Sequence, residues 1–230
     1  IVRYRGEPLF ALAAVDAATA AAALAAVEVD IEPLPAYFDA ASARAPEAVL
    51  LHLDKPGNLE RTVEHDFGDV EAGFAAADLV MERSFHCAEL AHGQIELNAS
   101  VAHWDVEREQ LTVHSVTQVP YYLHLMLAQT LGLDSAAIRV VKPFVGGGFG
   151  HRVEPLNFEM VAGALARAAG GTVKLELTRE ETFLTHRARP DSDIHVKIGL
   201  TKSGEITAVD AEVVQRGGAY AGYGLVTILY

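Results

Sequence analysis

Three consecutive glycines, Gly146 to Gly148, constrain this chain more than any other feature of its sequence. They lie in the segment PFVGGGFGHR, which covers residues 143–152. The β-branched run 138–141 before it predicts a short strand, and residues 155–169 after it predict a helix. Glycines between a strand end and a helix start let the backbone approach a ligand closely, and they let N–H groups point at an anionic or oxo group.

Neither common nucleotide-binding loop fits this segment. A P-loop requires Lys and then Ser or Thr after its last glycine, whereas His151 and Arg152 stand here. The dinucleotide fingerprint requires G-x-G-x-x-G, but the glycines run G-x-G-x-G from Gly146 to Gly150. The planar guanidinium of Arg152 suits a phosphate or a carboxylate. The segment alone is also consistent with a mobile turn that binds nothing.

Composition excludes several classes of protein. The 230 residues carry a formal charge of −13, without a basic stripe, which argues against a nucleic-acid partner. The single cysteine, Cys87, allows no internal disulfide, no four-cysteine iron–sulfur cluster and no cysteine-rich zinc site. It favours a reducing, cytoplasmic setting. No run of 18 apolar residues predicts a membrane span. Because the chain begins at Ile1 without Met, we expect it to be a piece of a longer polypeptide.

The hydrophobic pattern predicts an α+β protein in two parts. Residues 5–15 and 27–31 read as strands around a helix at 17–26 that Asp16 caps, which predicts a small α/β unit. Periodicity fades over residues 39–64, where we place a boundary between residues 1–53 and 54–230. The second part predicts helices at 70–77 and 121–131, the latter ended by Gly132, and a helical turn at 178–186. Its predicted strands are 79–86, 100–104, 110–115, 138–141, 173–177, 194–199 and 206–214.

A few polar residues outside the glycine loop are candidates for chemistry. Gln118 directly precedes the helix 121–131, where an amide can donate to an oxo group, but also cap a helix or face solvent. Tyr220 and Tyr223 could act as phenol acids or pack with their hydroxyls satisfied. The histidines lack the helical spacing of a zinc protease, so no metal ligand is assigned.

These residues carry a resemblance to a known family. Thr117-Gln118, the loop 146–150 and the opening RGEP at residues 5–8 resemble the molybdenum-binding large subunit of the xanthine dehydrogenase/aldehyde oxidase family. The order of the motifs is similar along essentially all 230 residues. The segments TQVPYYLHL (117–125), KPFVGGGFG (142–150), TREETF (178–183) and GGAYAGYGLVTILY (217–230) are most similar to the 4-hydroxybenzoyl-CoA reductase branch.

The resemblance implies a fold, a cofactor and partners. Residues 1–53 would be the end of an α/β-hammerhead domain, and residues 54–230 the start of the first molybdopterin-binding domain, with mixed sheets and helices. Molybdenum would be held by a molybdopterin dinucleotide without a protein ligand to the metal, with Gln118 hydrogen-bonded to a metal oxo group. The loop residues Gly147, Gly148, Phe149 and Gly150 would lie against the cofactor. Iron–sulfur clusters and FAD are expected on partner subunits.

One departure from the family bears on the substrate. The resemblance implies that purine-oxidising members carry a glutamate four residues after the loop phenylalanine, which hydrogen-bonds the heterocycle. This chain has Val153 at that position. A valine cannot pair with a purine edge, whereas it suits a benzene ring. The sequence therefore favours reductive removal of the hydroxyl from 4-hydroxybenzoyl-CoA, with Tyr220 or Tyr223 as proton donor. Two alternatives stay open: an oxidative hydroxylase of an aldehyde or heterocycle, and a non-catalytic module that holds an anion.

Overall fold

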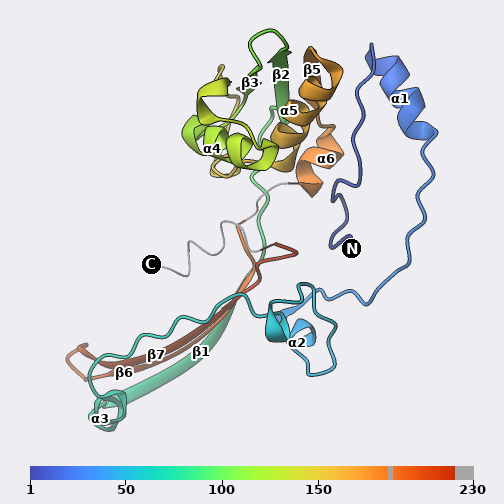
Figure 1. The fold of residues 1–230 in the computed structure, drawn as a ribbon. Coiled ribbons are helices and arrows are strands. Elements are labelled where there is room, and N and C mark those ends of the chain that lie inside the picture. The colour runs from blue at the N-terminus through green and yellow to red at the C-terminus, as the bar shows by residue number, and fades with distance from the viewer. Residues whose placement is uncertain (186–188, 221–230) are drawn as a thin grey trace. The chain divides into compact units, whose positions relative to one another are not determined.

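The computed structural model describes residues 1–185 and 189–220 of the chain (Figure 1). They form two compact units, Ile1–Pro33 with Ala91–Arg187 and Leu34–Leu90 with Ala188–Tyr230. The helices are α1 (Ala17–Ala25), α2 (Ala40–Ala43), α3 (Val70–Ala75), α4 (Pro120–Leu131), α5 (Asn157–Ala169) and α6 (Arg179–Leu184), with 3-10 turns η1 (Pro56–Asn58) and η2 (Ser135–Ala137). The strands are β1 (Leu79–Cys87), β2 (Ala99–Asp105), β3 (Gln110–Ser115), β4 (Ile138–Val141), β5 (Thr172–Glu176), β6 (Ser192–Leu200) and β7 (Ile206–Gln215).

The first unit is built on a four-stranded mixed sheet in the order β4-β3-β2-β5. Strands β2 and β3 form an antiparallel hairpin, β5 pairs antiparallel with β2, and β4 runs parallel to β3. A parallel neighbour requires a crossover, and α4 supplies it between β3 and β4. The glycine loop follows β4 directly, so it lies beyond the end of an edge strand.

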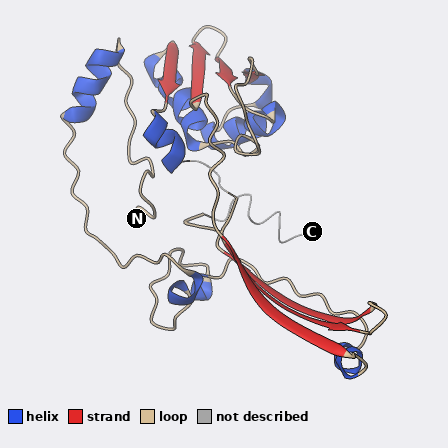
Figure 2. Cartoon of the chain, turned by 180° about the vertical axis from the view of Figure 1, so that it is seen from behind, coloured by secondary structure: helices blue, strands red, loops and turns tan. Residues whose placement is uncertain are grey.

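One face of this sheet is covered by helices, as Figure 2 shows for the unit with the short strands. Buried and less buried residues alternate along β2 and β3, and the buried ones, Ala102, Trp104, Leu111 and Val113, share one face. Leu123 and Leu127 of α4 and Ala162 and Ala166 of α5 pack against that face in a single core. Leu111, Leu123 and Leu127 are at most 1% exposed. The burial of this core fixes both helices that flank the glycine loop.

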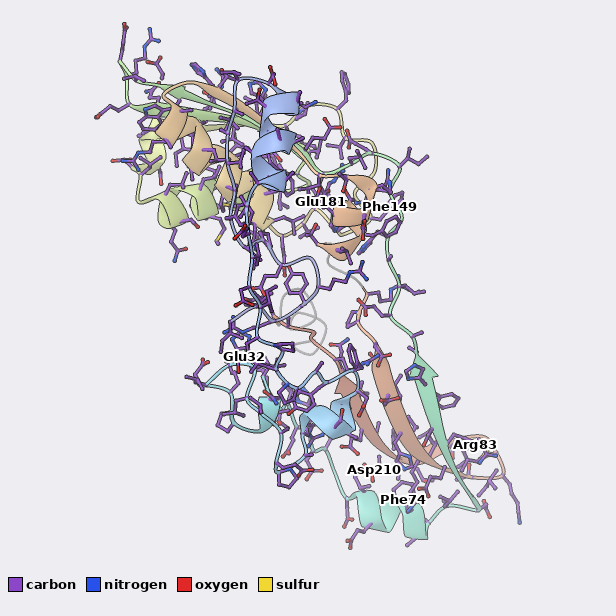
Figure 3. The ribbon with its side chains drawn as sticks, turned by 90° about the vertical axis from the view of Figure 1, so that its right-hand side faces the viewer. Glu32, Phe74, Arg83, Phe149, Glu181 and Asp210 are labelled. Atoms are coloured by element: carbon purple, nitrogen blue, oxygen red, sulfur yellow. The ribbon has the colours of Figure 1, made fainter. Side chains whose placement is uncertain are left out.

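The second unit is an antiparallel three-stranded sheet, β1-β6-β7, with α3 packed against it. Gly73 of α3 lies so close to β7 that an added Cβ would stand 2.3 Å from the carbonyl oxygen of Thr207. The ring of Phe74, labelled in Figure 3, lies 4.7 Å from the Nζ of Lys197 on β6. These contacts hold the short helix on one end of the sheet.

Most of the predicted elements are confirmed within a few residues. Asp16 caps α1 by accepting a hydrogen bond from the Thr19 N–H, and Gly132 ends α4 in the left-handed conformation. The mixed α+β class is confirmed, whereas the hammerhead assignment and the boundary at residue 53 stay predictions. No helix within residues 1–185 and 189–220 is long and apolar enough to cross a membrane.

The predicted strands at residues 5–15 and 27–31 are wrong. Both segments are without regular structure on either side of α1, and the strand–helix–strand unit does not form. Their apolar side chains stay exposed, with Phe10 at 45% and Ile31 at 57%. An alternating run becomes a strand only where another strand lies beside it to pair with, and no strand of the described chain pairs with either segment.

Candidate functional site

The glycine loop is held against the segment that leads into α4 by hydrogen bonds centred on Gln118. Its side-chain Oε1 accepts from the Gly150 N–H at 3.0 Å and from the Arg152 N–H at 3.2 Å. Its backbone N–H donates to the Arg152 carbonyl at 2.9 Å. The helix cap at α4 is Val119, without a side-chain bond, so Gln118 is not a cap. The Gln118 side chain is held instead by its hydrogen bonds to the glycine loop.

This arrangement fixes which way the Gln118 amide points. Because two N–H groups donate to its oxygen, the oxygen faces the loop, and the Nε2 group faces away from these donors. The Nε2 group donates to nothing within the described residues. An amide N–H₂ held in this way is a ready donor to an oxygen of a bound group.

Three further donors lie in the loop itself. The backbone N–H groups of Gly147, Gly148 and Phe149 donate no hydrogen bond to the part of the chain that the structure describes. Gly147 and Phe149 both have positive φ, at 105° and 53°. The Phe149 side chain, labelled in Figure 3, is 71% exposed. The loop therefore presents a run of N–H donors beside an uncovered aromatic ring, which suits an anionic or oxo group.

Gly148 has no room for a side chain beside Gln118. A Cβ added at this position would stand 2.5 Å from Oε1 and 2.6 Å from Cδ of Gln118. The predicted residues Gln118, Gly147, Gly148, Phe149 and Gly150 are thus brought together by the fold. Their roles toward a cofactor stay predictions.

The Arg152 guanidinium is not available to a ligand. It is 3% exposed, and its Nη1 pairs with the carboxylate of Glu96. Its Nη2 donates to the carbonyls of Glu96 at 3.1 Å and Leu97 at 3.0 Å, and its Nε donates to Asn98 Oδ1 at 3.4 Å. The carboxylate for which this residue is suited comes from the chain itself.

His151, also in the loop, is fully buried against Asn98. The Asn98 amide lies within hydrogen-bond distance of His151 Nε2, with its Nδ2 at 3.0 Å and its Oδ1 at 3.2 Å, and the same Oδ1 accepts from Arg152 Nε at 3.4 Å. Both side chains that follow the last loop glycine are structural.

Glu159 joins the first turn of α5 to the end of β3. Its carboxylate accepts from Ser115 Oγ at 2.6 Å and from the Leu156 N–H at 2.8 Å, and the residue is 3% exposed. Burial raises the pKa of this carboxyl above its ordinary 4.5, against the opposing effects of Ser115, Leu156 and Arg152.

This raised pKa predicts a pH-dependent stability. The folded chain binds the Glu159 proton more tightly than the unfolded chain, so the free energy of unfolding falls as pH rises from 4.5 through the raised pKa. Glu159→Gln stays neutral and should gain stability relative to wild type between about pH 4.5 and pH 7.5, by about 1.4 kcal/mol for each tenfold difference in proton affinity between the folded and unfolded chains. Urea titrations at both pH values measure this. An equal difference at the two would contradict it.

Tyr220, one of the two predicted catalytic tyrosines, belongs to the second unit. Its ring lies edge-on to His52 with centroids 5.3 Å apart. Tyr223, the other, lies outside the described residues. Tyr220 and the glycine loop thus belong to different units, and the role of the two tyrosines as proton donors stays a prediction.

One cluster of possible metal-binding side chains occurs in the described residues. His86, Asp191 and Asp193 place ligand atoms within 4.8 Å of one another. The buried Asp191 already accepts from Arg216, with Nε to Oδ1 at 2.7 Å, and this bond raises the pKa of Arg216. A cation there would face the guanidinium, so we assign no metal to the cluster.

Sequence reasoning missed Glu96 and the role of Arg179. Glu96 lies in the turn-rich insert before β2, and its Oε2 accepts from the Gly146 N–H at 2.7 Å. Arg179, the first residue of α6, donates to the carbonyls of Gln94, at 2.8 Å, and Ile95. No local pattern marks either contact, because the partners are 50 or more residues apart in sequence.

Comparison with known proteins identifies the family of the chain. The family model described as "Molybdopterin cofactor-binding domain" matches residues 51–230. The chain is 31% identical over 223 residues to the nicotinate dehydrogenase large molybdopterin subunit of Eubacterium barkeri, covering 97% of this chain and 52% of that protein. It is 30% identical over 223 residues to the xanthine dehydrogenase molybdenum-binding subunit of Escherichia coli O157:H7, covering 97% of this chain and 29% of that one.

Solved structures give the same result for the fold. CO dehydrogenase from Oligotropha carboxidovorans matches with a TM-score of 0.79 and 28% identity, over 87% of this chain and 26% of that one. The aldehyde oxidoreductase from Desulfovibrio gigas matches with a TM-score of 0.77 and 26% identity, over 87% and 22%. The chain spans only part of each relative. It belongs to the molybdopterin cofactor-binding domain family of xanthine dehydrogenase-type molybdenum oxidoreductases.

Proposed function

We propose that the chain is the part of a molybdenum-dependent oxidoreductase subunit that holds one side of a molybdopterin dinucleotide at the metal. The observation that carries this is the fixed amide of Gln118, whose oxygen is held by two loop N–H groups while its Nε2 is left to donate. When bound, the cofactor supplies two-electron redox chemistry at molybdenum.

The residues of the chain fit such a group. The N–H groups of Gly147, Gly148 and Phe149 can donate to oxygens that carry negative charge. A Cβ at Gly148 would collide with the Gln118 side chain, so the glycine is what allows Gln118 to lie against the loop beside these donors. Phe149 offers an apolar wall that keeps water from one side of the site.

For the substrate, the first candidate is an aldehyde or an aromatic heterocycle that is hydroxylated. Water supplies the oxygen, and two electrons and two protons are released. The names of relatives support this direction, since they include a nicotinate dehydrogenase and an aldehyde oxidoreductase. Val153 lacks the hydrogen-bonding groups that would hold a purine, which favours a less polar ring.

The second candidate is the reduction of 4-hydroxybenzoyl-CoA to benzoyl-CoA. Here two electrons and two protons enter, and the phenolic hydroxyl leaves as water. Val153 and the likeness of residues 217–230 to the reductase branch favour it. Tyr220 or Tyr223 would donate a proton to the ring. In either direction, electrons would pass through iron–sulfur and FAD subunits, because this chain has one cysteine.

The test uses the complete molybdenum subunit with its partner subunits. Elemental analysis for molybdenum comes first, and a molybdenum-free protein would leave only a non-catalytic, anion-holding module. One portion is then incubated anaerobically with 4-hydroxybenzoyl-CoA and a low-potential reductant, and benzoyl-CoA is sought by chromatography. A second portion receives nicotinate or benzaldehyde with a dye as electron acceptor. Unaltered turnover after Tyr223→Phe would remove that residue from the proposal.

A further inference from the structure

Residues 94–98, called the strap here, lie close to the glycine loop and accept hydrogen bonds from two arginines. Arg179 donates to the carbonyls of Gln94 and Ile95, and Arg152 donates to the next two, those of Glu96 and Leu97. Four consecutive carbonyls are therefore bound by guanidinium groups. Bonds of this kind are charge-assisted and hold a segment without secondary structure in one position.

The strap is also joined to the sheet of the first unit. The Asn98 carbonyl accepts from the Leu177 N–H at 2.9 Å, and the Asn98 side chain is fully buried between His151 and Arg152. Because the strap is fixed to the sheet in this way, a group that its other side chains bind is also fixed relative to the sheet.

Glu96 is the side chain by which the strap reaches the loop. Its Oε2 accepts from the N–H of Gly146, the first loop glycine, at 2.7 Å, and the same carboxylate pairs with Arg152 beyond the last one. A Cβ at Gly146 would stand 2.8 Å from the Glu96 Cβ, so the strap and the loop are in close contact here. One carboxylate thus closes the loop at both ends.

The bonds continue from Arg152 to Gln118. The Arg152 N–H donates to Gln118 Oε1, and the Arg152 carbonyl accepts from the Gln118 N–H. Any displacement of Arg152 therefore moves the amide whose Nε2 faces the site.

We infer that Glu96 is a positioning residue for the molybdenum site. It does not face the cofactor; it sets the shape of the glycine loop and, through Arg152, the direction of the Gln118 amide. This inference rests on the proposed function only for the identity of the bound group. The hydrogen bonds that run from Glu96 through Arg152 to Gln118 involve residues of this chain alone.

The first measurement is amide hydrogen exchange in the complete subunit with its partners, prepared without molybdate. Glu96→Gln keeps an acceptor for the Gly146 N–H but removes the charge that Arg152 requires. We expect exchange across residues 144–153 to become about tenfold faster, while exchange in β2 and β3 stays unchanged. The matched control is Glu107→Gln, an exposed glutamate of the β2–β3 hairpin.

The second measurement reports on the metal in the protein loaded with molybdenum. The electron paramagnetic resonance spectrum after partial reduction with dithionite is expected to differ between Glu96→Gln and wild type, and not between Glu107→Gln and wild type. A residue that only supported the fold would lower the thermal midpoint and leave this spectrum as it is.

Wild-type protein gives a check that needs no variant. The Gly146 N–H, although on an exposed residue, should exchange about tenfold more slowly than a free glycine amide because Glu96 holds it. Exchange of the Gly146 N–H at the free rate in wild type would overturn the inference. It would also be overturned if Glu96→Gln changed neither the exchange of the loop nor the paramagnetic resonance spectrum. A molybdenum-free wild type would instead overturn the proposed function, and with it the role of Glu96 at a metal.

Discussion

Gly148→Ala is expected to reduce turnover per subunit by about a hundredfold or more while the chain still folds. The new methyl group would stand 2.5 Å from Oε1, 2.6 Å from Cδ and 2.8 Å from Cγ of Gln118, closer than real contacts allow. Gln118 must then leave its position between Gly150 and Arg152, and its Nε2 no longer points at the site. The φ of Gly148 is not in the left-handed region, so the backbone itself tolerates alanine.

Gly171→Ala is the matched control for this change. Gly171 also lacks a positive φ, and nothing lies within 4 Å of where its Cβ would be. We expect its molybdenum content and turnover to equal those of wild type. Gly148→Ala with wild-type turnover would show that the loop does not hold Gln118 at the reacting centre.

Local sequence signals predicted most of the elements, because their causes are local. Asp69 caps α3 and Thr178 caps α6 through their own side chains, so a few neighbouring residues determine where each helix begins. The strands predicted at 5–15 and 27–31 failed for the opposite reason. Pairing depends on a second strand, and no property of the segment itself reports whether one is present.

The candidate site divides in the same way. The glycine loop and Gln118 were found because their residue types alone carry the chemistry. Glu96 was not found, since its partner Gly146 is 50 residues away and a lone glutamate in a polar insert looks like any solvated charge. Arg152 lies between these two cases. The sequence identified it as a cation that suits a carboxylate, and only the fold identifies that carboxylate as Glu96.

Arg152→Met is expected to lower the free energy of unfolding by about 2–3 kcal/mol, the largest effect on stability in this site. Methionine keeps most of the buried volume but leaves the carbonyls of Glu96 and Leu97 and the Asn98 oxygen without the donor they had. The loss is smaller than for a fully buried pair, because the Glu96 side chain is 32% exposed and water can reach it.

Urea titration of the chain, followed by the fluorescence of its single tryptophan, Trp104, measures this loss in the unit that contains the site. Arg139→Met is the control, since Arg139 is exposed on β4 and its replacement should change stability by less than about 0.5 kcal/mol. In the double variant with Glu96→Gln, the total loss should be smaller than the sum of the two single losses, because either change alone breaks the same ion pair. Additive losses would mean that Arg152 stabilises the loop through its backbone carbonyl contacts and not through the charge of Glu96.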